Sequence, residues 1–511
     1  MQLNVNPAIP VIMVVYLLFI LLFGIFMSRR AKTMSDYYIA GKKAPPFVAI
    51  VSGSAAIMSG FGLVGIPGLA YNFGMVVYWI QVPAILGFSV AAFFIARKLR
   101  LLAEVREVYS VPDAMALRYS RFPVAARVMG VLGLLSGLLG YLSVEFMALG
   151  VVMASIFPVS IWTGVLIGTA IVGIYTTLGG IAGGIWTDLI QFCMEMVAGL
   201  AVIVASFAVI GGPVGILHTF AASAVPRWRY HGLLWWPAGA GGLGVFAALG
   251  YAVSFTFGHM GQPQLLAKYY THRDIGKMKW QALGNGITYS LAALMSFAGL
   301  TLAALVAAGK VAPLKNSNFA APYFFVHYIP TWIVGLLFAA LVAASMATTN
   351  GFANIASAAL TRDLMQKTFG MQMDDRTGLL WGRVWTVILI LVALVVTYFW
   401  KTLIGFAGSA AWSTLASVFL PLISIGLNWR RATSYGAIAG AATGIFTSLY
   451  FTVAGVNPGG FQGTSLAIVL SVLVFVVVSL LTPRDELAPD VEAIMGLSEF
   501  SPRVTRPQAA R

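Results

Sequence analysis

The chain has 511 residues, of which 59% are hydrophobic and 9% are charged, and its mean hydropathy is +0.89. Soluble domains carry about 25% charged residues, so this composition excludes a string of soluble domains and predicts an all-α polytopic membrane protein. The net charge of +15 does not indicate nucleic-acid binding, because the basic residues do not gather on a solvated domain. The single cysteine, Cys193, excludes a disulfide framework and a multi-cysteine metal site.

Apolar stretches that are long enough to cross a membrane, which takes about 20 residues of helix, follow one another along most of the chain. Because the first of them is followed by Arg29 and Arg30 and not by a small-residue cleavage site, we interpret it as a span and not as a signal peptide. In chain order the thirteen stretches are 9–27, 48–71, 74–97, 128–157, 161–178, 186–210, 242–262, 281–308, 332–361, 384–400, 403–426, 437–454 and 464–482.

The spans are expected to form one transmembrane domain, residues 1–482, with a core at about 48–426. Residues 483–511 carry scattered charges and prolines and are predicted to form a disordered cytoplasmic tail. Lysine and arginine stay on the cytoplasmic side of a membrane, and 26 of the 31 lie in alternate loops and the tail. The N-terminus is therefore predicted outside the cell and the C-terminus inside, in the cell (inner or plasma) membrane.

Two of the spans are interrupted by residues that break helices. The stretch 48–71 contains five glycines and Pro67, and the stretch 242–263 contains five glycines and ends at Gln262-Pro263. One such stretch is explained by close helix packing. Two of them, five spans apart, predict a five-plus-five inverted repeat in which discontinuous helices free backbone carbonyls for cations.

Carboxylates inside a membrane are costly, so each one has either a buried partner or a function. Glu145, near the middle of its span, is either a protonated hydrogen-bonding group or a residue linked to substrate or ion binding. Asp188, at the start of its span, is either a favourable charge at a helix N-terminus or part of an ion pathway. Glu195 receives no assignment.

Two further features of the spans carry polar groups. His259, in the second interrupted stretch, is either a structural hydrogen-bonding group or a functional one. Residues 343–351 are rich in hydroxyl and small side chains. Their hydroxyls either bond to their own helix or, packed against the first interrupted stretch, supply the oxygen ligands of a small alkali cation.

One motif is more specific: Gly179-Gly180 is followed by Trp186-Thr187-Asp188 and Gln191. It is similar to the "GG…WTDxxQ" element of the sodium/solute symporters, the family that includes proline, pantothenate, monocarboxylate and sugar carriers. The resemblance implies a five-plus-five, LeuT-like core with extra helices at its ends, and sodium-coupled uptake by alternating access. Further matches, spread over about residues 30–430, are Asp36-Tyr37-Tyr38, Gly65-Ile66-Pro67-Gly68, Gly261-Gln262-Pro263, Lys268 and Thr361-Arg362-Asp363-Leu364.

The resemblance also implies a sodium site. Two departures from the family pattern remove oxygen ligands: Ala347 stands where a second hydroxyl is usual, and Ile57 where a polar residue is often found. Protons could therefore replace sodium, and Glu145 could supply the missing negative charge. The implied sodium ligands are the carbonyls of Ala55, Met58 and Ala344 and the hydroxyl of Thr348.

The solute pocket of the proline branch corresponds here to Phe61, Tyr141, Phe255 and His259, to which we add Glu145, with Asp188 assigned to the ion pathway. Several of the pocket residues differ from those of the proline branch, which favours a related small solute over proline itself.

The sequence thus predicts a sodium-coupled symporter that imports an amino acid, a monocarboxylate or a pantothenate-like solute. Sodium is the expected co-transported ion, and no enzymatic activity, nucleic acid or obligate protein partner is expected. Two alternatives stay open. The first is a proton-coupled symporter of the same fold. The second is a solute-sensing receptor that acts with a separate kinase, because a 29-residue tail is too short to hold a kinase domain.

Overall fold

The computed structural model describes residues 3–497 except residues 4, 29–32, 226–243 and 401. Within this part of the chain the regular structure is helical, with one isolated β-bridge between Ala44 and His272. The helices within the predicted spans are α1 (Ala8–Ser28), α3 (Pro46–Ala55), α4 (Ile66–Phe73), α5 (Tyr78–Ala91), α8 (Pro123–Ile156), α9 (Ile161–Ile210), α12 (Val245–Phe257), α14 (Gln281–Ala293), α15 (Ser296–Ala307), α17 (Thr331–Ala358), α18 (Asp375–Phe399), α19 (Ile404–Phe419), α20 (Ser434–Ala454) and α21 (Gly463–Leu481).

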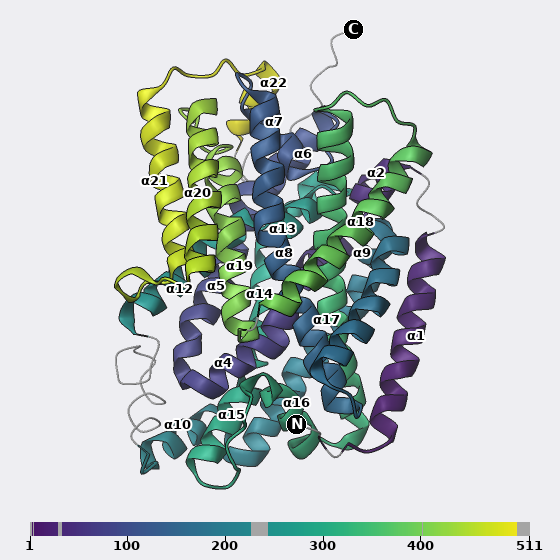
Figure 1. Ribbon diagram of the computed structural model, residues 1–511, viewed down its shortest axis with the longest axis vertical. Coiled ribbons are helices and arrows are strands. Elements are labelled where there is room, and N and C mark those ends of the chain that lie inside the picture. The colour runs from purple at the N-terminus through teal and green to yellow at the C-terminus, as the bar shows by residue number, and fades with distance from the viewer. Residues whose placement is uncertain (1–2, 4, 29–32, 226–243, 401, 498–511) are drawn as a thin grey trace.

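Further helices join or flank these elements: α2 (Met34–Ile39), α6 (Arg97–Val105), α7 (Val111–Arg118), α10 (Gly212–Ala222), α13 (Pro263–Tyr269), α16 (Ala320–Tyr328) and α22 (Pro489–Met495). The helices α10, α15 and α16 lie at one end of the bundle, and α6 and α22 lie at the other (Figure 1).

Every predicted span contains helix, although residues 242–243 of the seventh lie outside the described residues. Ten helices in the described part of the chain are long and apolar enough to cross a membrane, so the count of thirteen crossings is not confirmed. Burial separates the core from the periphery. In the most apolar window of the helix that begins at Pro123, 89% of the residues are buried, compared with 28% for the helix Asp375–Phe399. The helices α8, α17 and α19 are therefore central, and α18 faces outward.

Both interrupted stretches are broken in the structure, as predicted. The helix α3 ends at Ala55, residues 56–59 belong to no helix, and a helical segment resumes at Gly60 and continues into α4. The helix α12 ends at Phe257, and a 3-10 turn, Gly258–Gly261, leads to Gln262 with extended backbone angles (φ −91°, ψ 105°) before α13 begins at Pro263. Proline disfavours the helical conformation in the residue before it, which explains the second break.

The helix α9 contains the fifth and sixth predicted spans, which are separated by a sharp kink at Gly180. Gly180 has φ 58° and ψ −169°, which are not helical angles and which glycine adopts without a steric penalty. A Cβ at this position would also lie 2.5 Å from the ring of Tyr37. The glycine of the family-like motif is therefore required by both the backbone angles and the neighbouring ring.

The first part of the tail, for which disorder was predicted, contains the helix α22. The helix α22 has three buried apolar residues, Val491, Ile494 and Met495, and Arg106 in the loop after α6 forms an ion pair with Asp490 at 2.8 Å. The composition of the tail is polar, but its few apolar residues are spaced so that one helical face can bury them. Residues 498–511 lie outside the described residues.

The docking of α22 is expected to depend on the Arg106–Asp490 ion pair. The hydrogen bond from Arg106 lowers the pKa of Asp490, so the ion pair stabilises docking at neutral pH and loses its effect as the pH falls through the lowered pKa. A partly exposed ion pair contributes about 0.2–1 kcal/mol. Arg106→Ala should therefore raise amide hydrogen exchange in α22 by up to about fivefold at pH 7, whereas Lys310→Ala, in an exposed loop, should not. Equal exchange in the two variants would show that this ion pair does not hold the helix.

Candidate functional site

Two of the predicted sodium ligands, Thr348 and Met58, meet at the break between α3 and the segment that leads into α4. The Thr348 hydroxyl oxygen lies 3.4 Å from the carbonyl oxygen of Met58 and 3.5 Å from that of Ala56. These separations are long for hydrogen bonds. They match the spacing between neighbouring oxygens that all bind one ion at a distance of about 2.4 Å. This distance is typical of calcium, and the radius of sodium is close to that of calcium. Ala55 is the last residue of α3, and Ala344 lies one turn before Thr348 on α17. The structure thus brings Thr348 and Met58 together and adds the carbonyl of Ala56, which was not predicted.

Glu145 also reaches this break. Its side chain is fully buried, and its Oε2 accepts a hydrogen bond of 2.8 Å from the backbone N–H of Gly60, where the helix resumes. The free N–H groups at the start of a helix favour a negative charge or a polar acceptor. One turn earlier on α8, the Tyr141 hydroxyl bonds to that of Ser59 at 3.0 Å. The side chains of α8 therefore fix the position of the break through Ser59 and Gly60.

The absence of a side chain at Gly60 is essential to this contact. A Cβ there would lie 2.5 Å from the Ala148 Cβ, 2.7 Å from the Ser345 hydroxyl and 2.8 Å from the Glu145 carboxylate. Gly60→Ala is expected to displace Glu145, to cost about 1–3 kcal/mol through overpacking, and to reduce solute uptake at least fivefold in vesicles. Gly62→Ala is the matched control, because a Cβ at Gly62 meets nothing within 4 Å. If both variants transported at the wild-type rate, the contact would not matter to function.

The residues predicted to line the solute pocket form a single cluster of rings. Phe61 stacks on Phe255 with ring centroids 5.8 Å apart, and Phe255 stacks on Trp412 at 5.7 Å. Tyr141 and His259 contact the same Trp412 ring at 6.0 and 4.7 Å. Trp412 was not predicted, although it is a large aromatic residue in a run of small ones on α19, and that contrast could have identified it.

Two polar atoms in this ring cluster have no partner. The His259 Nδ1 lies 2.8 Å from the Phe255 carbonyl oxygen, so in the neutral ring Nδ1 carries the hydrogen and Nε2 is an acceptor. Nε2 is buried without a hydrogen-bond partner, and so is the Trp412 Nε1–H donor. Buried polar groups are normally satisfied. One unsatisfied acceptor and one unsatisfied donor on adjacent rings are suited to a ligand that carries both a donor and an acceptor.

Asp188 connects three helices. Its carboxylate lies 2.8 Å from the Lys268 ammonium on α13 and accepts a hydrogen bond from the Ser52 hydroxyl on α3. All three side chains are buried. The Asp188 carboxylate therefore forms an ion pair within the bundle, and it holds the α3 and α13 halves of the two broken helices against α9.

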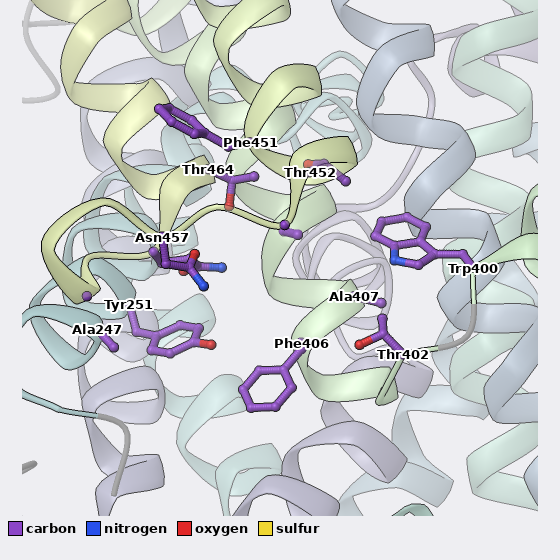
Figure 2. A pocket seen from close by; sticks show the side chains of 14 residues that line it. Ala247, Tyr251, Trp400, Thr402, Phe406, Ala407, Phe451, Thr452, Asn457 and Thr464 are labelled. Carbon is purple, nitrogen blue, oxygen red and sulfur yellow. The ribbon is translucent and has the colours of Figure 1, made fainter.

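A cavity of about 520 Å³ lies next to the ring cluster, between the first turns of α12 and α19 and the α20–α21 connection. Tyr251, Phe406 and Asn457 are among the residues that line it (Figure 2). Tyr251 is one turn before Phe255 on α12. The cavity therefore approaches the rings from the side of the α20–α21 connection.

Comparison with known proteins agrees with this architecture. A model of the sodium:solute symporter family matches residues 37–444. The chain is 26% identical over 448 residues to the high-affinity proline transporter PutP of Bacillus subtilis, covering 86% of this chain and 90% of the relative. It is 25% identical over 483 residues to the sodium/proline symporter of Escherichia coli K12, covering 90% and 92%.

Solved structures share the fold. A sodium-coupled sialic acid symporter in a substrate-bound, outward-open state matches with a TM-score of 0.73 at 19% identity, over 94% of this chain and 98% of that one. MhsT in complex with L-phenylalanine matches with a TM-score of 0.51 at 14% identity, over 85% and 97%. The family match covers most of the chain, and both the broken helices and the cluster of carbonyls around the Thr348 hydroxyl lie within the matched residues. The protein is therefore a member of the sodium:solute symporter family.

Proposed function

We propose that this protein imports a small zwitterionic solute of the amino-acid type, and that sodium binds where α17 meets the break after α3. As a member of its family, the protein couples solute movement to sodium by alternating access. The observation that carries the proposed ion position is the placement of the Thr348 hydroxyl against the carbonyls of Met58 and Ala56. Transport without covalent chemistry follows from this assignment.

The membrane potential supplies part of the driving force. With the N-terminus outside and the C-terminus in the cytosol, as the lysine and arginine distribution favours, the cavity at the α20–α21 connection opens toward the outside. An inside-negative potential favours entry of each positive charge by about 2.3 kcal/mol per 100 mV. Sodium that enters from this side moves down both its concentration gradient and the potential.

The ring cluster supports a solute with both an amine and a carboxylate. The unpartnered His259 Nε2 accepts a hydrogen bond and suits an ammonium group, whereas the Trp412 Nε1–H donates one and suits a carboxylate. The flat faces of Phe61 and Phe255 add apolar surface and attraction for a cation. The relatives named as proline transporters handle a solute with this pair of groups. A monocarboxylate would leave the acceptor on His259 unsatisfied.

Binding of the two substrates is coupled through the broken helix. Phe61 of the ring cluster lies only three residues after Met58, whose carbonyl faces Thr348. An ion that orders this segment raises the fraction of molecules in which the solute site is formed. The apparent dissociation constant of the solute falls by the same factor by which this fraction rises.

Uptake into proteoliposomes tests the proposal. Radiolabelled amino acids, short monocarboxylates and pantothenate are offered with an inward sodium gradient, and with potassium in place of sodium as the matched control. We expect sodium-dependent accumulation of at least one amino acid and of none of the solutes that lack an amine. Accumulation that is the same in sodium and potassium would refute sodium coupling, and accumulation of monocarboxylates alone would refute the solute class.

A further inference from the structure

A second cavity lies on the outside of the bundle, between the first half of α9 and α18. Its volume is about 540 Å³, within the range of about 300–1,000 Å³ that is typical of ligand sites. Apart from Thr169 and Thr177, the residues that line it are apolar or glycine. Leu391 in its wall is 56% exposed, so the cavity opens away from the core. We call it the α9–α18 groove, and its α18 residues are Val387, Ile390, Leu391 and Leu394.

The groove has the length of about one leaflet of a bilayer. On α9 it extends from Leu166 to Leu178, which is a rise of about 18 Å along a helix, and the hydrocarbon core is about 30 Å thick. One end is closed by the rings of Trp162 and Tyr398, whose centroids lie 5.1 Å apart. Each ring belongs to a residue one turn beyond the groove lining on its own helix. These dimensions suit a single acyl chain that lies along the two helices.

A basic residue continues the wall of the groove at its other end. Arg383 precedes the four α18 lining residues by 4, 7, 8 and 11 positions, which places it on the same helical face. At this end α2 joins the two walls. The Tyr37 hydroxyl donates a hydrogen bond to the Thr177 carbonyl at 3.4 Å, and a Cβ at Gly382 would lie 3.7 Å from the Tyr37 ring. Arg383, the next residue after Gly382, therefore lies at the mouth of the groove.

The charge of Arg383 is not balanced by a carboxylate. Its side chain is half-buried, and its Nε is buried without a hydrogen-bond partner. None of the ion pairs found among the described residues includes Arg383 or the exposed Arg376, which lies two turns earlier on the same face. A partly buried charge is costly unless an opposite charge binds to it. The guanidinium group of arginine is suited to phosphate, which it binds through two parallel N–H donors.

We infer that the α9–α18 groove binds one anionic phospholipid, with an acyl chain between the two helices and the phosphate on Arg383. The order of groups along α18, basic at the helix start and then apolar, matches the order of headgroup and chain in a lipid. An arginine stem lies along apolar surface while its charge reaches the membrane interface. In the proposed orientation this interface is the cytoplasmic one, whose leaflet carries the anionic lipids.

A second copy of this chain is a poorer occupant. In a symmetric dimer the same surface packs against itself, so it would bring a second Arg383 to the groove and no acidic lining residue. The inference goes beyond the proposed function, because it does not depend on which ion or solute the protein carries.

Lipid binding is measured by native mass spectrometry of the purified full-length protein. The protein is titrated with phosphatidylglycerol and, for comparison, with phosphatidylcholine that has the same acyl chains and no net charge. We expect the tightest site of the wild type to prefer phosphatidylglycerol by about fivefold or more. Arg383→Gln should bind the two lipids equally. Arg484→Gln removes an exposed arginine beyond the last span and should keep the preference of the wild type.

A second variant tests the position of the acyl chain. Ala170 is exposed on the α9 wall of the groove, so Ala170→Phe fills the groove without entering the core. It should lose the tight site for both lipids. Val392→Phe is the matched control, because Val392 is 41% exposed on α18 and does not line the groove. It should bind both lipids as the wild type does.

The remaining outcomes overturn the inference. Equal affinity of the wild type for the two lipids, or an unchanged preference in Arg383→Gln, would show that no phosphate binds to Arg383. Tight binding by Ala170→Phe would place the lipid elsewhere. A wild-type dimer that Ala170→Phe converts to a monomer, with lipid binding unchanged, would show that a second copy covers the groove. If Ala170→Phe fails to fold by size-exclusion chromatography, Arg383→Gln decides the question.

Discussion

Replacing Thr348 with alanine is expected to raise the sodium concentration for half-maximal uptake by about 10- to 100-fold. The hydroxyl contributes one of the oxygens that surround the proposed ion, together with the carbonyls of Met58 and Ala56. An interaction with a charged group is worth about 1.5–3 kcal/mol, and each 1.4 kcal/mol is a factor of ten. Initial uptake rates over a range of sodium concentrations, at saturating solute, give the value directly.

Thr348→Ser is the matched variant, because it keeps the oxygen and removes only a methyl group. It should stay within about threefold of the wild type in sodium dependence. If the alanine variant has the sodium dependence of the wild type, the ion does not bind at this hydroxyl, and the proposed ion position is wrong even where sodium coupling itself persists.

Replacing Lys268 with methionine is expected to destabilise the protein by about 3–5 kcal/mol, because it leaves the Asp188 carboxylate buried without a counter-ion. The midpoint of thermal unfolding in detergent should fall by several degrees, and the fraction of folded protein recovered from membranes should fall with it. Arg430→Met removes an exposed ion pair with Glu492, with the two charged groups 3.9 Å apart. It should change stability by no more than about 1 kcal/mol.

The double variant Asp188→Asn with Lys268→Met separates pairing from packing. It removes both charges, so its stability should recover most of what Lys268→Met loses, since an apolar or neutral pair of similar size is often as stable as a buried ion pair. A double variant as unstable as the single one would mean that the aliphatic part of Lys268, and not its charge, holds α13 in place.

Much of the fold could be predicted because it depends on local chemistry. The breaks at residues 56–59 and at Gln262 follow from glycine, serine and proline within apolar stretches, and these residues act on their own backbone. The membrane character follows from composition. The kink at Gly180 lies in the motif that resembles the family, although its positive φ was not predicted.

The parts of the site that could not be predicted depend on contacts between distant segments. Glu145 and Gly60 are 85 residues apart, and Asp188 and Lys268 are 80 apart. No pattern within a single helix indicates that they meet. Trp412 stands out in the sequence among small residues of α19, but the rings that it contacts follow from the packing of α12 against that helix. The docking of α22 was missed for the same reason, because its partner, Arg106, lies in another part of the chain.

The attachment of α3 and α13 to one carboxylate has a consequence for the coupling between ion flux and solute flux. The α3 and α13 halves of the two broken helices come from opposite repeats, yet both are tied to Asp188. Movement of one half away from α9 removes one of the two partners of the Asp188 carboxylate, so we expect a partial opening that releases the ion without the solute to be unfavourable. We therefore expect this shared attachment to keep the ratio of ions to solute molecules fixed.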